Sequence, residues 1–224
     1  MKAVVFDMDG LMFDTERVAI LAWDYAGEKM GIDKAGYMVY KTLGVTVNAS
    51  NQIWKKEFGD RYNEEELWKY TREFNNDFYA KNKVPVKKGL YILLDYLKAN
   101  GYKLAVASST SKRGVERNLK SAEVLEYFDA VICGDMVEKS KPEPEIYLKA
   151  CEALNVEPAE ALALEDSRNG LLSAHRAGMK VIMVPDLWEA DEEVKSFLWK
   201  MCSDLEEVKN FLEEQQSFSG KTEN

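Results

Sequence analysis

Short apolar segments alternate with helical patterns along most of this sequence, and this alternation restricts the possible folds more than any other feature. The apolar segments are bounded by polar or turn residues, which is typical of buried parallel strands. We expect strands at residues 2–7, 102–108, 130–134, 161–166 and 180–186. Helical patterns lie between them at residues 87–99, 111–121, 144–154 and 168–177. Ser203 and Glu206 have the spacing of a capping box, which predicts a terminal helix from about residue 204. The pattern as a whole predicts an α/β fold with a doubly wound, Rossmann-like parallel sheet, whose ligands bind at the carboxyl ends of the strands.

One interval interrupts the alternation. It contains helical patterns but no apolar segment that suggests a buried strand, and it separates the first strand from the next helix of the sheet. We therefore predict a Rossmann-like core formed by residues 1–14 and 86–224, with an inserted α-helical domain at residues 15–85. Apolar side chains such as Leu67 and Phe74 recur there at helical spacing, and we interpret them as a small helical core rather than a substrate-stacking surface.

Composition argues against several classes of partner. The 224 residues carry a formal net charge of -9, which disfavours nucleic acid and anionic membranes as partners, because both require a basic face. Three cysteines without C-x-x-C spacing favour a reduced protein, and a single histidine disfavours histidine-rich metal sites. The N-terminal apolar run is broken by Asp7 and Asp9, so it does not resemble a signal peptide. We expect a cytoplasmic protein, monomeric or weakly oligomeric, without nucleic acid or membrane partners.

Acidic side chains follow two of the predicted strands. Asp7 and Asp9 are two residues apart and face the same way at the end of the first strand, and Glu165 and Asp166 occur at the end of the fourth. Each pair alone also fits an exposed acidic turn. Because the carboxyl ends of parallel strands meet at one edge of the sheet, the four acids should lie close together and repel one another unless a cation lies among them. Hard oxygen ligands favour Mg²⁺, which commonly binds a few carboxylates, waters and a substrate phosphate.

Groups that could bind phosphate follow two other strands. Ser108 and Ser109 end the second strand and lead into a helix, where hydroxyls and backbone N–H groups either bind an anion or cap the helix. Lys141 precedes Pro142, which favours an extended backbone at the lysine. Most lysines on loops are only solvated charges, but one held at this edge of the sheet would neutralise a phosphate or the carboxylates.

These residues together suggest phosphoryl transfer. A carboxylate is an established nucleophile for phosphoryl groups, so Asp7 would attack and form an aspartyl phosphate. Asp9 would protonate the leaving oxygen and later accept a proton from the attacking water. Lys141, Mg²⁺ and the Ser108 hydroxyl would stabilise charge on the transferred oxygens.

The order and separation of these motifs resemble those of the haloacid dehalogenase-like hydrolase superfamily. The motifs are D-M-D-G at 7–10, a hydrophobic strand ending in Ser108, Lys141 followed by proline, and E-D-S at 165–167. The resemblance covers nearly the whole chain, and the helical insertion is similar to that family's cap domain. It is strongest to the branch that contains β-phosphoglucomutases and small-molecule phosphatases.

The resemblance implies a role for each matching residue. Asp7 would be nucleophile and metal ligand, and Asp9 would be the acid/base, with its backbone carbonyl on Mg²⁺. Ser108 and Lys141 would bind the phosphoryl group, with Ser109 beside them. Asp166, with or without Glu165, would complete the metal site.

The same resemblance leaves alternatives. Asp9 disfavours dehalogenation, because the dehalogenases of the superfamily lack this residue. Ala19 and Val47 stand where β-phosphoglucomutases have a histidine and an arginine that grip a sugar phosphate, so hydrolysis is favoured over a mutase reaction. A non-catalytic phosphate-binding module is a third possibility, although every catalytic position is filled. We expect an enzyme, a Mg²⁺-dependent phosphatase acting on a small phosphomonoester, with residues 44–46 touching the substrate.

Overall fold

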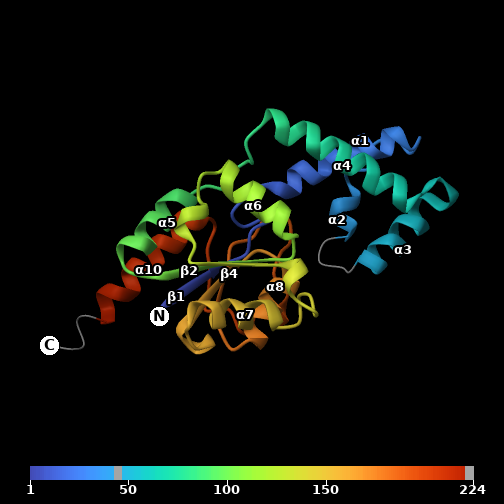
Figure 1. Ribbon diagram of the computed structural model, residues 1–224. Helices are drawn as coiled ribbons and strands as arrows, with labels where there is room; N and C mark the ends of the chain where they lie inside the picture. Colours follow the sequence, from blue (N-terminus) through green and yellow to red (C-terminus); the bar gives the residue numbers. More distant parts are fainter. Residues whose placement is uncertain (43–46, 220–224) are drawn as a thin grey trace. The chain divides into compact units, whose positions relative to one another are not determined.

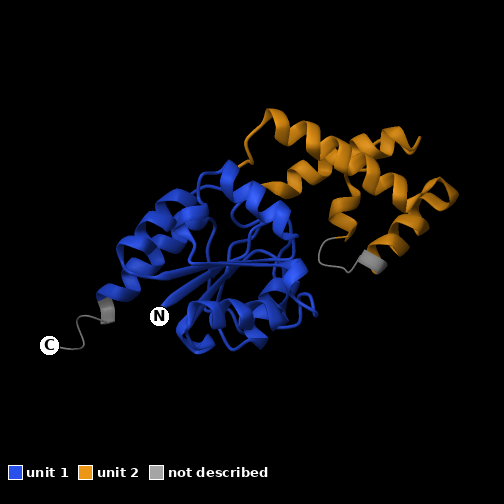
Figure 2. Cartoon of the chain, viewed as in Figure 1, with its two compact units in different colours: residues 1–13, 86–224 blue, residues 14–85 orange. Residues whose placement is uncertain are grey.

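The chain folds into two compact units. A computed structural model describes residues 1–42 and 47–219. The larger unit contains residues 1–13 and 86–224, and the smaller unit contains residues 14–85 (Figure 2).

A six-stranded parallel sheet forms the centre of the larger unit (Figure 1). Its strand order is β3-β2-β1-β4-β5-β6, and each neighbouring pair is parallel. The strands are β1 (Ala3–Phe6), β2 (Lys103–Ser108), β3 (Ala130–Cys133), β4 (Ala161–Glu165), β5 (Lys180–Met183) and β6 (Lys200–Met201). The predicted doubly wound α/β fold is confirmed. The chain reverses its direction across the sheet between β1 and β4, which is where such sheets bind their ligands.

The register brings the ends of the central strands to the same level. Phe6 pairs with Val106 of β2 and with Leu164 of β4. The backbone N–H of Asp7 then donates to the carbonyl of Leu164 at 3.0 Å, so the polar residues that follow β1 and β4 start side by side.

Helices cover both faces of the sheet (Figure 1). On one face, α7 (Glu145–Leu154) and α8 (Arg168–Arg176) pack against strand residues that are mostly small, including Ala105, Ala107 and Ala163. Small side chains allow a helix to approach a strand closely, which brings polar groups of α7 and α8 near the strand ends. The other face is covered by α5 (Leu90–Ala99), α6 (Lys112–Ser121) and α10 (Leu205–Ser219). Short helices complete the unit: η2 (Leu125–Tyr127), η3 (Gly134–Met136), η4 (Pro158–Glu160) and α9 (Glu192–Lys195).

The beginning of α10 differs from its prediction. The cap is Asp204, whose side chain accepts the N–H of Glu207 at 2.9 Å. The Glu207 carboxylate in turn accepts the N–H of Ser203 at 2.7 Å. The predicted pairing of Ser203 with Glu206 is therefore wrong by one residue, although the helix begins at Leu205, close to the predicted position.

The smaller unit is helical in its described residues. Its elements are α1 (Thr15–Lys29), α2 (Met38–Thr42), α3 (Val47–Phe58), η1 (Gly59–Arg61) and α4 (Glu64–Lys81). Trp54 and Leu67 lie in its buried core, and Trp23 meets Trp54 edge-on with ring centroids 5.2 Å apart. The predicted small helical core is thus confirmed for Leu67. Phe74 lies outside this cluster; it is half-buried and stacks on Phe78 with ring centroids 5.9 Å apart. The segment predicted to touch substrate, residues 44–46, lies outside the described residues.

No helix in the described parts of the chain is both long enough and apolar enough to cross a bilayer.

Candidate active site

A tight turn at the end of β1 presents Asp7 and Asp9. The backbone N–H groups of Met12 and Phe13 both donate to the carbonyl of Met8, at 3.0 and 3.1 Å. The apolar side chains of the turn are buried, so the turn is anchored in the core. Asp7 is consequently buried, while Asp9 is half-buried.

Gly10 lets this turn approach the end of β4. Its φ of +84° lies in the left-handed region, and a Cβ at this position would lie 2.2 Å from Oδ2 of Asp166. Asp7, Glu165 and Asp166 each offer a carboxylate oxygen, and these three atoms lie within 4.8 Å of one another. The structure therefore brings three of the four predicted acids close together.

Lys141 supplies a cation to this acidic cluster. Its Nζ lies 2.6 Å from Oδ1 of Asp7 and 2.6 Å from Oε1 of Glu165. It also donates to the carbonyl of Ala107 at 3.0 Å, so three acceptors face the three N–H bonds of the ammonium. Three carboxylates against one ammonium leave an excess of negative charge that a divalent cation would balance.

Burial and charge act on the pKa values of this ion pair in opposite ways. Burial raises the pKa of Asp7 well above its ordinary value, against the opposing charge of Lys141, and the charges of Glu165 and Asp9 raise it further. Burial alone would lower the pKa of Lys141, but the charges of Asp7 and Glu165 raise it above its ordinary value. The lysine therefore keeps its charge at neutral pH.

Both oxygens of Glu165 are occupied by hydrogen bonds. Oε1 accepts from Lys141 and from the hydroxyl of Tyr147, the latter at 2.7 Å. Oε2 accepts from the N–H of Asp166 at 3.2 Å and from the N–H and hydroxyl of Ser167 at 3.3 and 3.1 Å. Burial and the charge of Glu165 raise the pKa of Tyr147 well above its ordinary value, so the hydroxyl acts as a donor. Tyr147 was not among the predicted site residues.

Hydroxyls from the end of β2 orient Asp9. Thr110 donates to Oδ2 of Asp9 at 2.7 Å and Ser108 donates to the same oxygen at 3.3 Å. Ser108 is fully buried, and its oxygen accepts the N–H of Thr110 at 3.1 Å. Ser109 is exposed, and its carbonyl packs against Gly134, where a Cβ would lie 2.1 Å away. Thr110 was not among the predicted site residues, although its two-residue spacing from Ser108 parallels that of Asp7 and Asp9.

The N-terminus of α6 binds a carboxylate of the protein itself. Asp135 in η3 accepts the N–H of Lys112 through both oxygens, at 3.1 and 3.2 Å. Ser111 occupies the cap position without a side-chain capping bond. The interpretation in which a serine or threonine caps this helix is therefore not observed, because the N–H of Lys112 is bound by Asp135 instead. The anion-binding interpretation of Ser108 and Ser109 stays a prediction.

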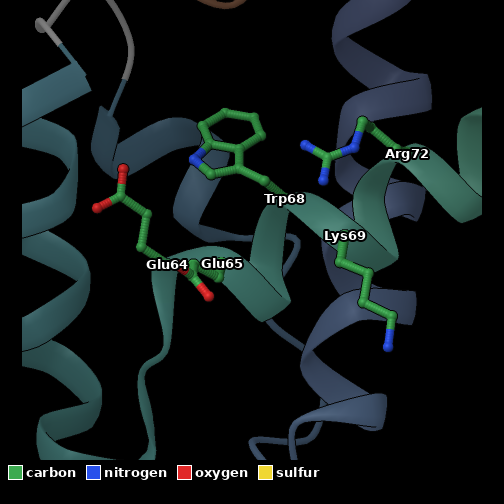
Figure 3. A pocket seen from close by; sticks show the side chains of 5 residues that line it. All are labelled: Glu64, Glu65, Trp68, Lys69 and Arg72. Atoms are coloured by element: carbon green, nitrogen blue, oxygen red, sulfur yellow. The ribbon is translucent and has the colours of Figure 1, made fainter.

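A surface hollow in the smaller unit contains no comparable constellation. It has a volume of about 620 Å³ and is lined by side chains of one helix: Glu64, Glu65, Trp68, Lys69 and Arg72 (Figure 3). Acidic and basic side chains at this spacing are typical of a solvated helix face. The buried carboxylates Asp7, Glu165 and Asp166 lie instead together at the strand ends.

Three comparisons place the chain among known proteins. A family model described as "Haloacid dehalogenase-like hydrolase" matches residues 4–184. The Bacillus subtilis (strain 168) protein YhcW, which its name provisionally classes as a phosphatase, is 35% identical and covers 83% of this chain and 84% of its own. A Thermotoga maritima protein named phosphorylated carbohydrates phosphatase is 31% identical over 81% of this chain and 84% of its own. A solved Thermotoga maritima structure, provisionally named a beta-phosphoglucomutase, has a TM-score of 0.80 and 29% identity, covering 96% of this chain and 99% of that one.

Proposed function

The chain belongs to the haloacid dehalogenase-like hydrolase family, and we propose that it is a Mg²⁺-dependent phosphatase that hydrolyses a small phosphomonoester through an aspartyl phosphate. One observation carries the proposal. Asp7 is a buried carboxylate held 2.6 Å from the Lys141 ammonium, with Glu165 and Asp166 beside it. A nucleophile with a cation at this distance suits the transfer of a phosphoryl group, whose negative charge needs compensation.

The acidic cluster fits a magnesium ion. Its donors are hard oxygens, they lie within 4.8 Å of one another, and the absence of a side chain at Gly10 makes room for the carboxylate of Asp166. Asp7, Asp166 and the backbone carbonyl of Asp9 would hold the ion, and bound Mg²⁺ would neutralise charge on the transferred phosphoryl oxygens. Glu165 is less suited as a ligand, because both of its oxygens already accept hydrogen bonds.

The residues of the chain divide the reaction into two displacements. In the first, the Asp7 carboxylate forms a bond to phosphorus as the ester P–O bond breaks, and Asp9 donates a proton to the leaving oxygen. In the second, Asp9 accepts a proton from water as the water oxygen bonds to phosphorus, which breaks the Asp7–phosphate bond and releases inorganic phosphate. Ser108 and Lys141 would contact the transferred group, with the exposed Ser109 at its periphery.

We further propose that the smaller unit is a cap that selects the substrate. The smaller unit, residues 14–85, is an insertion between β1 and α5, in the place where the family resemblance puts a cap. Phosphorylated small molecules are the substrate class that this assignment supports.

A sugar-phosphate mutase is the second candidate, favoured by the similarity to the solved structure named as a mutase. Ala19 and Val47 stand where the mutase resemblance would place sugar-gripping side chains, and they favour hydrolysis. A non-catalytic phosphate-binding module is the least supported candidate, because the nucleophile and its lysine are both in place.

The test is release of inorganic phosphate from a panel of phosphomonoesters, with and without Mg²⁺. Asp7→Asn should lower kcat by about 10³-fold or more, because no covalent intermediate can form. Asp77→Asn, the same change at an exposed carboxylate on α4, should leave activity unchanged. Conversion of β-glucose 1-phosphate to glucose 6-phosphate without phosphate release would indicate a mutase. No turnover of any substrate would favour the binding module.

A further inference from the structure

Tyr147 is a buried tyrosine on α7 to which the proposed mechanism gives no role. Its exposed fraction is 0%. Its hydroxyl donates to Oε1 of Glu165 at 2.7 Å, and Nζ of Lys141 lies 5.1 Å from the centroid of its ring. One side chain therefore contacts both the cation of the site and the carboxylate that faces it.

The hydroxyl and the ring act on the same two groups. Oε1 of Glu165 receives two donors, the tyrosine hydroxyl and the ammonium of Lys141 at 2.6 Å. A lysine side chain is flexible and its ammonium has no preferred direction, so its position depends on the acceptors around it. Without the hydroxyl, Oε1 would accept a hydrogen bond from Lys141 only, and its position would be less well determined. The ring confines the ammonium from another side by a cation–π contact.

A buried phenylalanine would fill the same space without a polar atom. Most of α7 facing the sheet is apolar, as at Ile146 and Ala150, so packing alone does not require a hydroxyl here. The hydroxyl instead donates to Oε1 of Glu165, the same carboxylate oxygen that accepts from Lys141. This points to control of the geometry of the Glu165 and Lys141 pair.

We propose that Tyr147 is a positioning residue that fixes Glu165 and, through it, aims the ammonium of Lys141 at Asp7. The kinetic form of this inference rests on the proposed phosphatase function. A displaced ammonium would stabilise the transferred phosphoryl oxygens less well, because their stabilisation depends on groups placed before the reaction starts.

The decisive variant is Tyr147→Phe, which keeps the ring and removes the hydroxyl. We expect kcat/KM for p-nitrophenyl phosphate to fall about 10- to 100-fold, as for other side chains that orient a reacting group through a hydrogen bond. KM and the inhibition constant of inorganic phosphate should rise, while the thermal unfolding midpoint changes little. Tyr147→Leu, which also removes the ring, should lose more activity. Tyr127→Phe is the matched control, because its hydroxyl donates at 2.6 Å to the exposed Asp95, away from the site.

If Tyr147 had only a structural role, Tyr147→Phe would lower the amount of active enzyme but leave KM and the phosphate inhibition constant unchanged. This result would overturn the proposal. A double-mutant cycle with Glu165→Gln tests whether Tyr147 acts through Glu165. If Tyr147 acts through Glu165, the effect of Tyr147→Phe should shrink at least severalfold in the Glu165→Gln background. Equal effects in both backgrounds would refute the proposed route.

The binding of inorganic phosphate separates this inference from the proposed function. If the wild-type protein hydrolyses no phosphomonoester, the phosphatase assignment fails. The binding of inorganic phosphate in the presence of Mg²⁺ is then measured by calorimetry for Tyr147→Phe and Tyr127→Phe. Weaker binding by Tyr147→Phe than by Tyr127→Phe would then support the positioning role. Equal binding, including no binding by either variant, would overturn it.

Discussion

Gly10→Ala should damage the site by displacing Asp166, and the chain contains a matched control for it. Gly10 and Gly178 both have a φ of +84°. A Cβ on Gly178 would meet nothing within 4 Å, whereas one on Gly10 would lie 2.2 Å from Oδ2 and 2.9 Å from Cγ of Asp166. The two substitutions therefore share the same backbone strain and differ in the collision with Asp166.

The expected magnitudes follow from these distances. Alanine in the left-handed region costs about 1–2 kcal/mol of folding free energy in either variant. In a chain of this size, each kcal/mol lowers the unfolding midpoint by about 2–4 °C. In Gly10→Ala the Asp166 carboxylate must also move by about 1 Å to restore ordinary contact, and a misplacement of that size can cost about 100-fold in activity.

Thermal unfolding and Mg²⁺-dependent phosphatase kinetics, measured on both variants, test this reasoning. Gly178→Ala should lose stability but keep kcat/KM within about twofold, since its strain lies outside the site. Gly10→Ala should lose about 100-fold in kcat/KM and need about tenfold more Mg²⁺ for half-maximal activity. If both variants have the same kinetics, Asp166 does not need its observed position, and the proposed metal site is wrong.

Two further predictions concern the surroundings of the site. Hydrogen bonds from Lys149 and from two backbone N–H groups lower the pKa of Glu145 to about 2 from its ordinary 4.5, so its stabilising effect is present above pH 4.5 and is lost as the pH falls toward 2. Thermal unfolding at several pH values should therefore show a steeper loss of stability over this window for the wild type than for Glu145→Gln; equal slopes would contradict this. Thr110→Val removes a hydroxyl that donates to Asp9 at 2.7 Å, so turnover of alkyl phosphates, whose leaving group needs a proton, should fall about tenfold. p-Nitrophenyl phosphate, whose leaving group needs little protonation, should be affected less, and an equal loss on both substrates would argue against an acid/base role for Asp9.

The main strands could be predicted because buried parallel strands are continuous apolar runs bounded by polar residues. β6 was missed because two residues carry no periodicity, and its strand conformation depends on pairing with β5, as between Met201 and Met183. The cap of α10 was misplaced because the sequence offers two capping boxes one residue apart. Ser203 with Glu206 and Asp204 with Glu207 have the same spacing, and only the three-dimensional contacts distinguish them.

The meeting of Asp7 and Glu165 could be anticipated from strand ends, because parallel strands deliver their carboxyl ends to one edge. Lys141 was expected there only as one of two possibilities, because it lies eight residues beyond the end of β3. The groups that orient them could not be anticipated. Tyr147 lies on a helix whose pattern shows only which face is buried, and nothing in a 3.6-residue period distinguishes a core tyrosine from one that donates to a carboxylate. Asp135 caps α6 from a separate element, a pairing that the local sequence around the helix does not contain.

For the adjacent acids at the end of β4, the alternation of strand residues could have predicted that Glu165 and Asp166 face different sides of the sheet. Successive strand residues alternate between the two faces of a sheet. Ala161 and Ala163 pack on the side of α7 and α8, so Glu165 belongs to that side, where it accepts the hydroxyl of Tyr147. Asp166 instead lies against Gly10. Two neighbouring carboxylates that look equivalent in the sequence are thus directed to different partners, one toward the helix layer and the lysine and the other toward the turn after β1. This division supports Asp166 as the metal ligand and Glu165 as the residue that orients the lysine.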